Sequence, residues 1–480
     1  MAASEGAARH RRIAREIESM IESGAFRAGE RLPSTRTLAR AKGASAATVA
    51  QAYESLAERG VITVRPRSGY FVASRRGVMR AAPIVAPGDD TRGKPPSAIQ
   101  SPLAVSELAF DILARIRKRQ VVPLGSAFPA PSHFPLARLA RDLARSARRM
   151  DPWRTVEDLS PGSLELRQQI AKRYALLGMS VDPEEIVVTS GAMEALNLCL
   201  AAATKPGDVV ALESPAFYAS LQAAERLGLK VVQVATDAQE GVGLAALEAA
   251  IRKRRVKACW LMPNLQNPLG ATMPEDKRRA LVKLLAKYDV PLVEDDVYAE
   301  LRFGGALPPA KAFDAKGLVM HCGSFSKSLA PGYRVGWCVP GRYRREVERA
   351  KLSTSIATSV PAQEGIAEFL RQGGYDRHLR QLRRAFATTQ ARMRAAIERA
   401  FPRGTRISSP EGGYFLWVEL PPRCDAMKLH AQAMREGISV APGPMFSASA
   451  AFTNALRINC GHPWDERTAA AVRLLGRLAR

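Results

Sequence analysis

A lysine surrounded by small hydroxyl residues, Lys327, lies in the stretch 323–337, and Arg334 follows it seven positions later. A lysine amine that loses its proton forms an imine with an aldehyde, and burial beside another cation lowers its pKa enough for this. The planar fork of Arg334 suits a phosphate. An aldehyde that also carries a phosphate is pyridoxal 5'-phosphate (PLP). The alternative is a surface lysine, because Ser-x-Ser-Lys is a short pattern.

Two stretches further upstream place small or aromatic residues directly after an apolar run. Thr-Ser-Gly-Ala at 189–192 opens a predicted helix, where free backbone N–H groups and the helix dipole favour a phosphate. Phe217 follows the next apolar run, where its ring is placed to stack on a flat cofactor or, in the plainer interpretation, to fill the core.

Polar residues in three more places need partners if they are buried. Asn267 lies in the turn at 263–270, which aims it inward. A protonated pyridine nitrogen is one partner for Asp295, and Tyr298 is placed to hydrogen-bond the phenolic oxygen of PLP. Arg457 stands in an apolar strand, an expensive place for a cation unless it meets a carboxylate.

The elements that carry these residues alternate along the chain. Strands are predicted at 186–189, 209–212, 231–234, 259–262 and 291–294, with amphipathic helices between them. Such alternation predicts an α/β fold, a mostly parallel sheet with helices on both faces. Ligands of such sheets lie at the carboxyl ends of the strands, which is where the residues above fall.

In this order the motifs resemble the fold type I aminotransferase family (class I/II) over residues 121–480. The resemblance implies the PLP-dependent transferase fold type I, with a smaller C-terminal α/β subdomain. It implies these contacts: Lys327 for the imine, Asp295 for the ring nitrogen, Asn267 and Tyr298 for the ring oxygen, Phe217 for stacking, Gly191, Ala192, Ser324 and Arg334 for the phosphate, and Arg457 for the carboxylate of an amino acid or keto acid.

The first 76 residues have a different pattern. A helix around Ile13 and Ile17 is followed by two more, which Ser34 and Ser45 are expected to cap, and then by a hairpin with strands at 61–64 and 70–72. This predicts a winged helix-turn-helix, with the third helix presenting side chains to the DNA major groove. The head has 14 Lys and Arg against 7 Asp and Glu, which suits DNA; the alternative is a protein-interaction domain.

The head resembles the GntR superfamily of bacterial regulators, through Arg-Leu-Pro-Ser-x-Arg, Ser-x-x-Thr-Val and Arg-x-Arg-Ser-Gly-Tyr-Phe-Val. The predicted DNA contacts are Arg36, Ser45, Thr48, Gln51, Arg67 and Gly69. Ala46 stands where members often carry arginine, so their operator sequence does not transfer to this chain.

Between head and body, residues 77–120 are expected to form a linker, since 77–101 is rich in Pro, Gly and mixed charge without apolar periodicity. Five arginines follow on a helical stretch at 138–149. They form either a solvated face or, as the alternative, a second contact with DNA.

The overall composition limits the kinds of partner, metal site and cellular compartment that the protein can have. The net charge is +25, which favours polyanionic partners, and the six cysteines are scattered without a CxxC pair, which predicts reduced thiols and no metal site. No signal-peptide core and no apolar run of membrane-spanning length is seen. We expect a cytoplasmic protein.

A GntR-type head joined to an aminotransferase-like body resembles the MocR-type transcriptional regulators over the whole chain. The resemblance implies a homodimer in which the head of one subunit lies against the body of the other. PLP, or PLP joined to an amino compound, would be the effector that acts at Lys327 on the binding of double-stranded DNA. The alternatives are a working aminotransferase, and a DNA-binding protein whose body is a dimerisation scaffold only.

Overall fold

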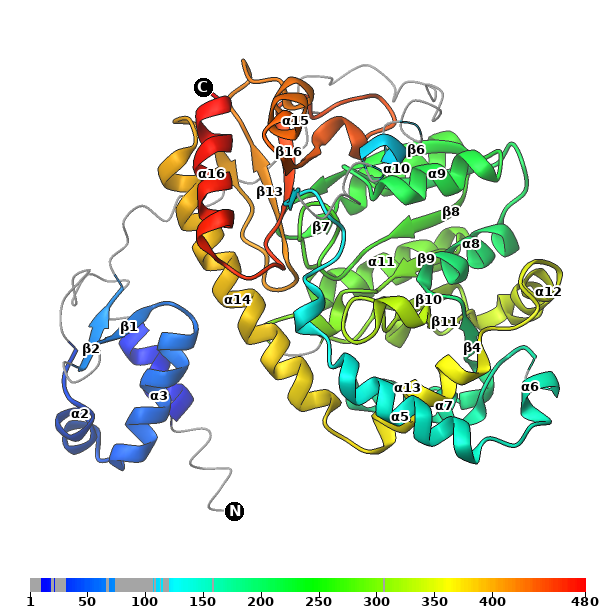
Figure 1. Ribbon diagram of the computed structural model, residues 1–480, viewed down its shortest axis with the longest axis horizontal. Helices are drawn as coiled ribbons and strands as arrows, with labels where there is room; N and C mark the ends of the chain where they lie inside the picture. Colours follow the sequence, from blue (N-terminus) through cyan, green and yellow to red (C-terminus); the bar gives the residue numbers. More distant parts are fainter. Residues whose placement is uncertain are drawn as a thin grey trace. The chain divides into compact units, whose positions relative to one another are not determined.

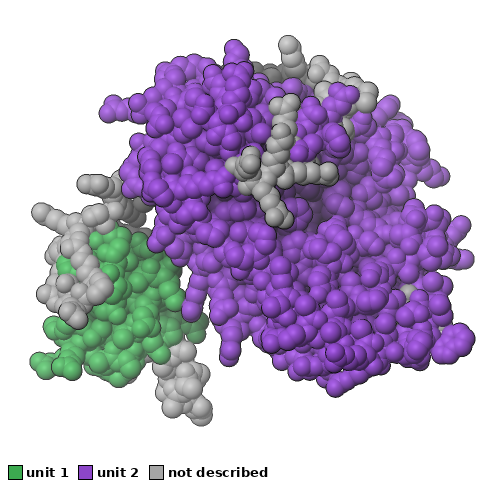
Figure 2. All heavy atoms as spheres, in the orientation of Figure 1, with its two compact units in different colours: residues 1–80 green, residues 81–480 purple. Residues whose placement is uncertain are grey.

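Two units, residues 1–80 and residues 81–480, make up the chain (Figure 2). The structure, a computed structural model, describes residues 10–18, 21, 32–65, 69–73, 107, 109–112, 114, 121–157, 159–304 and 307–480. Most of the predicted linker at 77–120 lies outside this set. Two of its residues, Ala109 and Ile112, are buried in the core of the second unit.

The described part of the first unit is a helix at residues 10–18, followed by α2 (Thr35–Lys42), α3 (Ala46–Glu58) and the antiparallel strands β1 (Ile62–Arg65) and β2 (Gly69–Val72). The Oγ atoms of Ser34 and Ser45 cap α2 and α3, as predicted, by accepting a bond from the backbone N–H three residues later. Its core contains Ile13, Ile17, Val49, Tyr53, Leu56, Ile62 and Val72.

The second unit is built on a sheet of eight strands (Figure 1). In spatial order they are β4 (Val187–Thr189), β11 (Gly336–Val339), β10 (Val319–Ser324), β9 (Leu292–Asp295), β8 (Val256–Leu261), β5 (Val209–Ser214), β6 (Lys230–Asp237) and β7 (Gly241–Val242). Strands β11 and β7 run in the direction opposite to that of the other six, so the mostly parallel α/β sheet is confirmed.

Helices cover both faces of this sheet. They include α7 (Leu164–Leu176), α8 (Ala192–Ala203), α9 (Tyr218–Arg226), α10 (Leu244–Arg254), α11 (Glu275–Tyr288), α12 (Arg344–Thr354) and α13 (Val360–Arg371). Successive residues of β5 show the two layers, since Leu212 packs in the core formed with α8 and α9, and Ala211 packs in the core formed with α10 and α11. Also in this unit are α5 (Leu136–Arg149), which packs against α13, and α6 (Arg154–Glu157).

The smaller C-terminal part has an antiparallel sheet of β12 (Arg406–Ile407), β13 (Phe415–Glu419), β16 (Ala455–Asn459) and β15 (Ala441–Pro442). The long helix α14 (Tyr375–Ala400) leads into it and packs against α16 (Glu466–Leu478) (Figure 1). Helix α15 (Ala426–Arg435) precedes β14 (Ile438–Ser439), which pairs with β3 (Val122–Pro123). None of the helices that the structure describes is long and apolar enough to cross a membrane.

Candidate functional site

The carboxyl ends of the large sheet surround a cavity of about 180 Å³. Seven of the predicted cofactor contacts line it: Lys327, Asp295, Tyr298, Phe217, Ala192, Ser324 and Arg334. They come together because β4, β5, β9 and β10 all end at one edge, and the loops that follow these strands meet there.

Lys327 is partly buried in the loop between β10 and β11. Its Nζ donates to the carbonyl oxygen of Ala127 at 3.0 Å and lies 3.8 Å from the centre of the Phe128 ring. Burial, and then the positive charges of Arg457 and Arg334, lower the pKa of the amine to about 7, although Asp295 opposes the shift. The predicted effect of Arg334 is present, but Arg457 contributes more.

Asp295 ends β9 and is 1% exposed. Its Oδ2 accepts a bond from Nε1 of Trp260 at 3.4 Å, whereas no described residue bonds its Oδ1. Burial raises the pKa of this carboxyl to about 7, against the opposing effect of the Trp260 bond. A charged donor at Oδ1 would relieve the desolvation of the carboxylate.

Arg457 and Asn267 form a buried pair beside the lysine. Nη1 of Arg457 donates to Oδ1 of Asn267 at 3.1 Å, and Nη2 donates to the carbonyl oxygens of Gly125 and Ser126 at 2.9 and 3.3 Å. The amide nitrogen of Asn267 and Nε of Arg457 lack a partner among the described residues. Arg457 is fully buried, and no described carboxylate lies within ion-pairing distance of it.

The residues predicted to bind the phosphate lie where β4 and β11 pair. A Cβ added at Gly191 would stand 2.4 Å from Nη2 of Arg334, and the φ of +87° at Gly191 also disfavours a side chain there. Nη1 of Arg334 donates to Oγ of Ser326 at 3.1 Å, and Oγ of Ser324 donates to the same oxygen at 3.0 Å. Backbone N–H groups at the start of α8 complete a site of the kind that binds phosphate.

The two predicted ring contacts differ in exposure. Tyr298 is 3% exposed, and its ring centre lies 5.9 Å from Nζ of Lys327. Burial raises the pKa of its phenol, so the hydroxyl keeps its proton and can donate a hydrogen bond. Phe217 is half-buried at the N-cap of α9 and has one edge against Tyr218, which leaves its other surface to the cavity.

Sequence reasoning missed the segment at 125–128. It supplies a carbonyl acceptor for Lys327, two acceptors for Arg457, and the Phe128 ring beside the lysine. Ser326, between Ser324 and Arg334, was also missed. The Ser-x-Ser-Lys pattern contains it, but only its hydrogen bonds to both neighbours show that it belongs to the phosphate site.

Four predicted DNA contacts lie on α2 and α3. Arg36, Ser45 and Gln51 are exposed, and Thr48 is half-buried. The Oγ atoms of Ser45 and Thr48 lie 2.8 Å apart, and Ser45 also accepts from the backbone N–H of Thr48 at 3.1 Å. This pair therefore shapes the start of α3 whatever else it contacts.

The other two predicted contacts belong to the wing. Gly69 begins β2 with a φ of +102°, a backbone conformation that glycine adopts without strain. Arg67 lies outside the described residues. Arg65 at the end of β1 pairs with Gly69 at the start of β2. This pairing sets the register of the two strands of the wing.

The cavity fits PLP in the groups it leaves unpaired. Among the described residues Oδ1 of Asp295 has no donor, and a protonated pyridine nitrogen is one. The amide nitrogen of Asn267 has no acceptor in the same part of the chain, and the phenolic oxygen of PLP is one. Lys327, with its pKa near neutrality, can react with an aldehyde, and the site around Arg334 suits a phosphate.

Two known families account for most of the chain. Residues 130–474 match "Aminotransferase class I and II", and residues 9–72 match "Bacterial regulatory proteins, gntR family". YdcR of Escherichia coli K12, described as an uncharacterized HTH-type transcriptional regulator, is 44% identical over 98% of both chains. YjiR of the same organism, described likewise, is 37% identical over 98% of both.

Among solved structures, the kynurenine aminotransferase of Pyrococcus horikoshii matches with a TM-score of 0.72 and 31% identity, over 78% of this chain and 94% of that one. The aminotransferases to which this chain is similar use PLP. The unpaired groups of the cavity indicate the same cofactor here. The chain therefore belongs to the class I and II aminotransferase family, and its gntR-type head makes it a PLP-dependent transcriptional regulator of the MocR type.

Proposed function

We propose that PLP, or PLP joined to an amino compound, bound at Lys327 modulates the binding of the head to its DNA operator. One observation supports this most: a single chain carries a gntR-type head with an exposed α3 N-terminus and a cavity whose unpaired groups match PLP. A ligand changes DNA binding only if its affinity differs between two states of the protein.

Each residue of the cavity has a task in this proposal. Lys327 supplies a neutral amine, and Asp295 holds a proton on the ring nitrogen. Asn267 and Tyr298 donate to the ring oxygen, and Phe217 stacks on the ring. Gly191, Ala192, Ser324 and Arg334 hold the phosphate. When bound, PLP supplies an electron sink next to the amine.

The effector in this proposal is an amino acid or another amino compound. Arg457 would bind its carboxylate, since the guanidinium is fully buried and has only neutral acceptors among the described residues. Binding there would bring an anion against Asn267 and the aromatic faces of Phe415 and Phe446, which lie 4.3 and 5.3 Å from the guanidinium carbon. The effector would therefore be sensed by the residues that hold the cofactor.

We also propose the boundaries 1–76 for the DNA-binding head, 77–120 for the linker and 121–480 for the effector-binding body. The family match at 9–72 lies inside the proposed head, and the match at 130–474 lies inside the proposed body. Aminotransferase-like folds are typically dimeric, and we extend this to a homodimer in which each head lies against the body of the other subunit. Two heads would then bind two half-sites of double-stranded DNA.

The test is a gel-shift titration with DNA from upstream of the gene, at fixed salt, with and without PLP. We expect PLP to strengthen, weaken or reposition the shift of the parent. Lys327→Ala should bind DNA but lose the response, because it lacks the amine that reacts with the aldehyde. Lys283→Ala, which changes an exposed lysine of α11, is the control and should respond like the parent. A Lys327→Ala protein that responds to PLP and amine like the parent contradicts the proposal.

A working aminotransferase is the second candidate, because every residue named for transamination is present, Asp295 and Arg457 included. Steady-state turnover of an amino acid at enzyme-like rates by a protein that binds no specific DNA would favour it. A colourless protein that binds DNA but no PLP would instead favour a body that serves only as a scaffold.

A further inference from the structure

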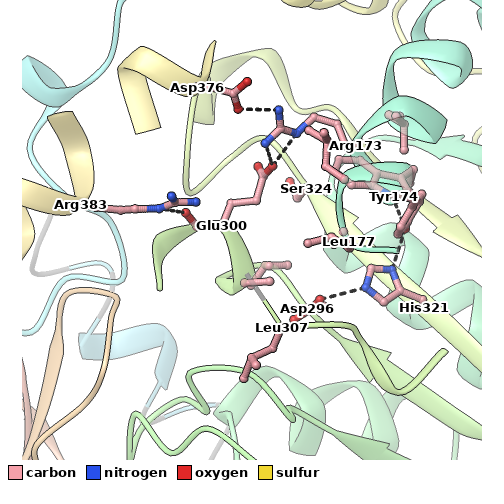
Figure 3. A pocket seen from close by; sticks show the side chains of 16 residues that line it. Arg173, Tyr174, Leu177, Asp296, Glu300, Leu307, His321, Ser324, Asp376 and Arg383 are labelled. Carbon is pink, nitrogen blue, oxygen red and sulfur yellow. Dashed lines mark hydrogen bonds and ion pairs between the residues drawn. The ribbon is translucent and has the colours of Figure 1, made fainter. Parts of the chain in front are cut away.

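A second cavity, of about 220 Å³, is shown in Figure 3. It shares Val297 and Ser324 with the cofactor cavity as lining residues. The residues proposed to hold PLP, apart from Ser324, do not line this second cavity. The two cavities are therefore adjacent but distinct.

The walls of the second cavity include the apolar side chains of Ile170, Leu177 and Leu307. Three of its polar lining residues bond one another. His321 bonds Asp296 at 3.0 Å and the hydroxyl of Tyr174 at 2.7 Å (Figure 3). This polar group is therefore satisfied and does not call for a polar ligand.

Two arginines, Arg173 and Arg383, also line the cavity, and they differ in their partners. Arg173 is neutralised, with Glu300 at 2.7 Å and Asp376 at 2.8 Å. Arg383 comes from α14 and donates from Nε to the backbone carbonyl of Glu300 at 2.7 Å (Figure 3). No carboxylate of the described chain pairs with Arg383, and its two Nη atoms have no hydrogen-bond partner there. A planar guanidinium with both Nη atoms available is suited to a carboxylate.

We propose that the second cavity binds a small carboxylic acid with an apolar body. The carboxylate bonds the Nη atoms of Arg383, and the body packs against Ile170, Leu177 and Leu307. A pocket with apolar walls and a few placed polar groups is the usual form of a small-molecule site, and here the other charged groups already have partners. Binding here does not require Lys327 or the aldehyde of PLP.

An occupant of this cavity would touch the same segment that holds PLP. Asp295 and Tyr298 line the cofactor cavity, Asp296 and Glu300 line the second one, and Val297 lines both. A ligand that moves residues 296–300 therefore moves Tyr298 and Asp295 as well. Coupling of this kind is reciprocal. If the acid changes the affinity of the protein for PLP by some factor, PLP must change the affinity for the acid by the same factor.

The test is calorimetric titration of the PLP-loaded protein with phenylacetate, which has neither an amine nor an aldehyde and cannot react with Lys327 or PLP. We expect one saturable site in the parent. Arg383→Ala should bind about ten- to a hundredfold more weakly, as expected for the loss of a hydrogen bond to a charged group. Leu177→Trp, which places a larger side chain in the apolar wall, should abolish binding.

Arg384→Ala is the matched control, because Arg384 is the next residue of α14, is exposed and does not line the cavity. It should bind phenylacetate like the parent. The absorbance band of bound PLP is the second measurement, and it should respond to phenylacetate in the parent and Arg384→Ala but not in Leu177→Trp. Unchanged binding in both Arg383→Ala and Leu177→Trp would place the acid at Arg457 and overturn the proposal, as would the absence of saturable binding by the parent.

Discussion

At the scale of single residues, the reactivity of Lys327 depends first on its burial and then on the charges of two arginines that are far apart in the sequence. Arg334 is seven residues away, whereas Arg457 lies in β16 of the smaller C-terminal part. With Ala127 as its hydrogen-bond acceptor, the amine is held beside the cavity with a pKa near 7. Half of the amines are then neutral near physiological pH without any base to deprotonate them.

This environment predicts how PLP-type aldehydes react with the cofactor-free protein as pH changes. Below the pKa the amine is protonated and inert, and above it the neutral amine reacts. The rate of attachment to Lys327 should rise roughly tenfold from about pH 6 to about pH 8 and then level off, for a pKa of about 7. Pyridoxal is the better probe, because it lacks the phosphate, which itself titrates in this range. The absorbance of the adduct measures the rate, and a rise that continues to the pH of an ordinary lysine would contradict the prediction.

Residue chemistry also marks the limit of what the sequence could predict. Lys327, Asp295 and Asn267 could be proposed because their side chains have distinct chemistry in short spaced motifs. Ala127 could not, since it contributes only a backbone carbonyl, 200 positions before the lysine that it contacts. The partners of the buried Asp296 could not be predicted either, since Asn264 follows β8 and His321 comes from the neighbouring strand β10.

At the scale of elements, prediction succeeded for five strands of the large sheet. Their predicted ends lie within two residues of the observed ones, except the end of β6 and the start of β8, which are three residues off, and the caps Ser34 and Ser45 are confirmed. Strands β10, β11 and β13 were not predicted. Neither were the two-residue strands β3, β7, β12, β14 and β15, because two residues cannot show an alternation. The short strands are placed by pairing with other strands, which a local pattern does not contain.

Helix α3 allows its cap to be separated from its predicted contact with DNA. Ser45→Ala removes the acceptor for the Thr48 N–H and should cost about 1 kcal/mol of unfolding free energy. Ser45→Asp keeps an acceptor and places a negative charge where the helix dipole favours it, so the head should keep its stability. The same charge should repel phosphates and weaken DNA binding. Thermal unfolding and a gel shift at fixed salt measure the two effects. If Ser45→Asp binds DNA as tightly as the parent, Ser45 does not lie near the phosphates.

At the scale of the whole molecule, the chain joins two units that each have a core of their own. The change in composition and pattern between head and body predicted this division. The cofactor cavity lies entirely in the second unit. A ligand stabilises only the part of a protein that it binds in the folded state.

Scanning calorimetry of the full chain should therefore show two unfolding transitions, and PLP should raise the temperature of one of them. At PLP concentrations about a hundred times its dissociation constant, the expected stabilisation is about 2.7 kcal/mol. In Lys327→Ala this rise should shrink, and the transition of the head should stay where it is in the parent. A single transition, or a shift of both by PLP, would show that the units do not unfold separately.

Val297 has a further consequence for anyone who wishes to redesign this protein as a sensor. Its side chain lines both cavities. A substitution at this one position would therefore change the space open to both occupants at once. It is the position at which the selectivity of the two sites could be tuned together.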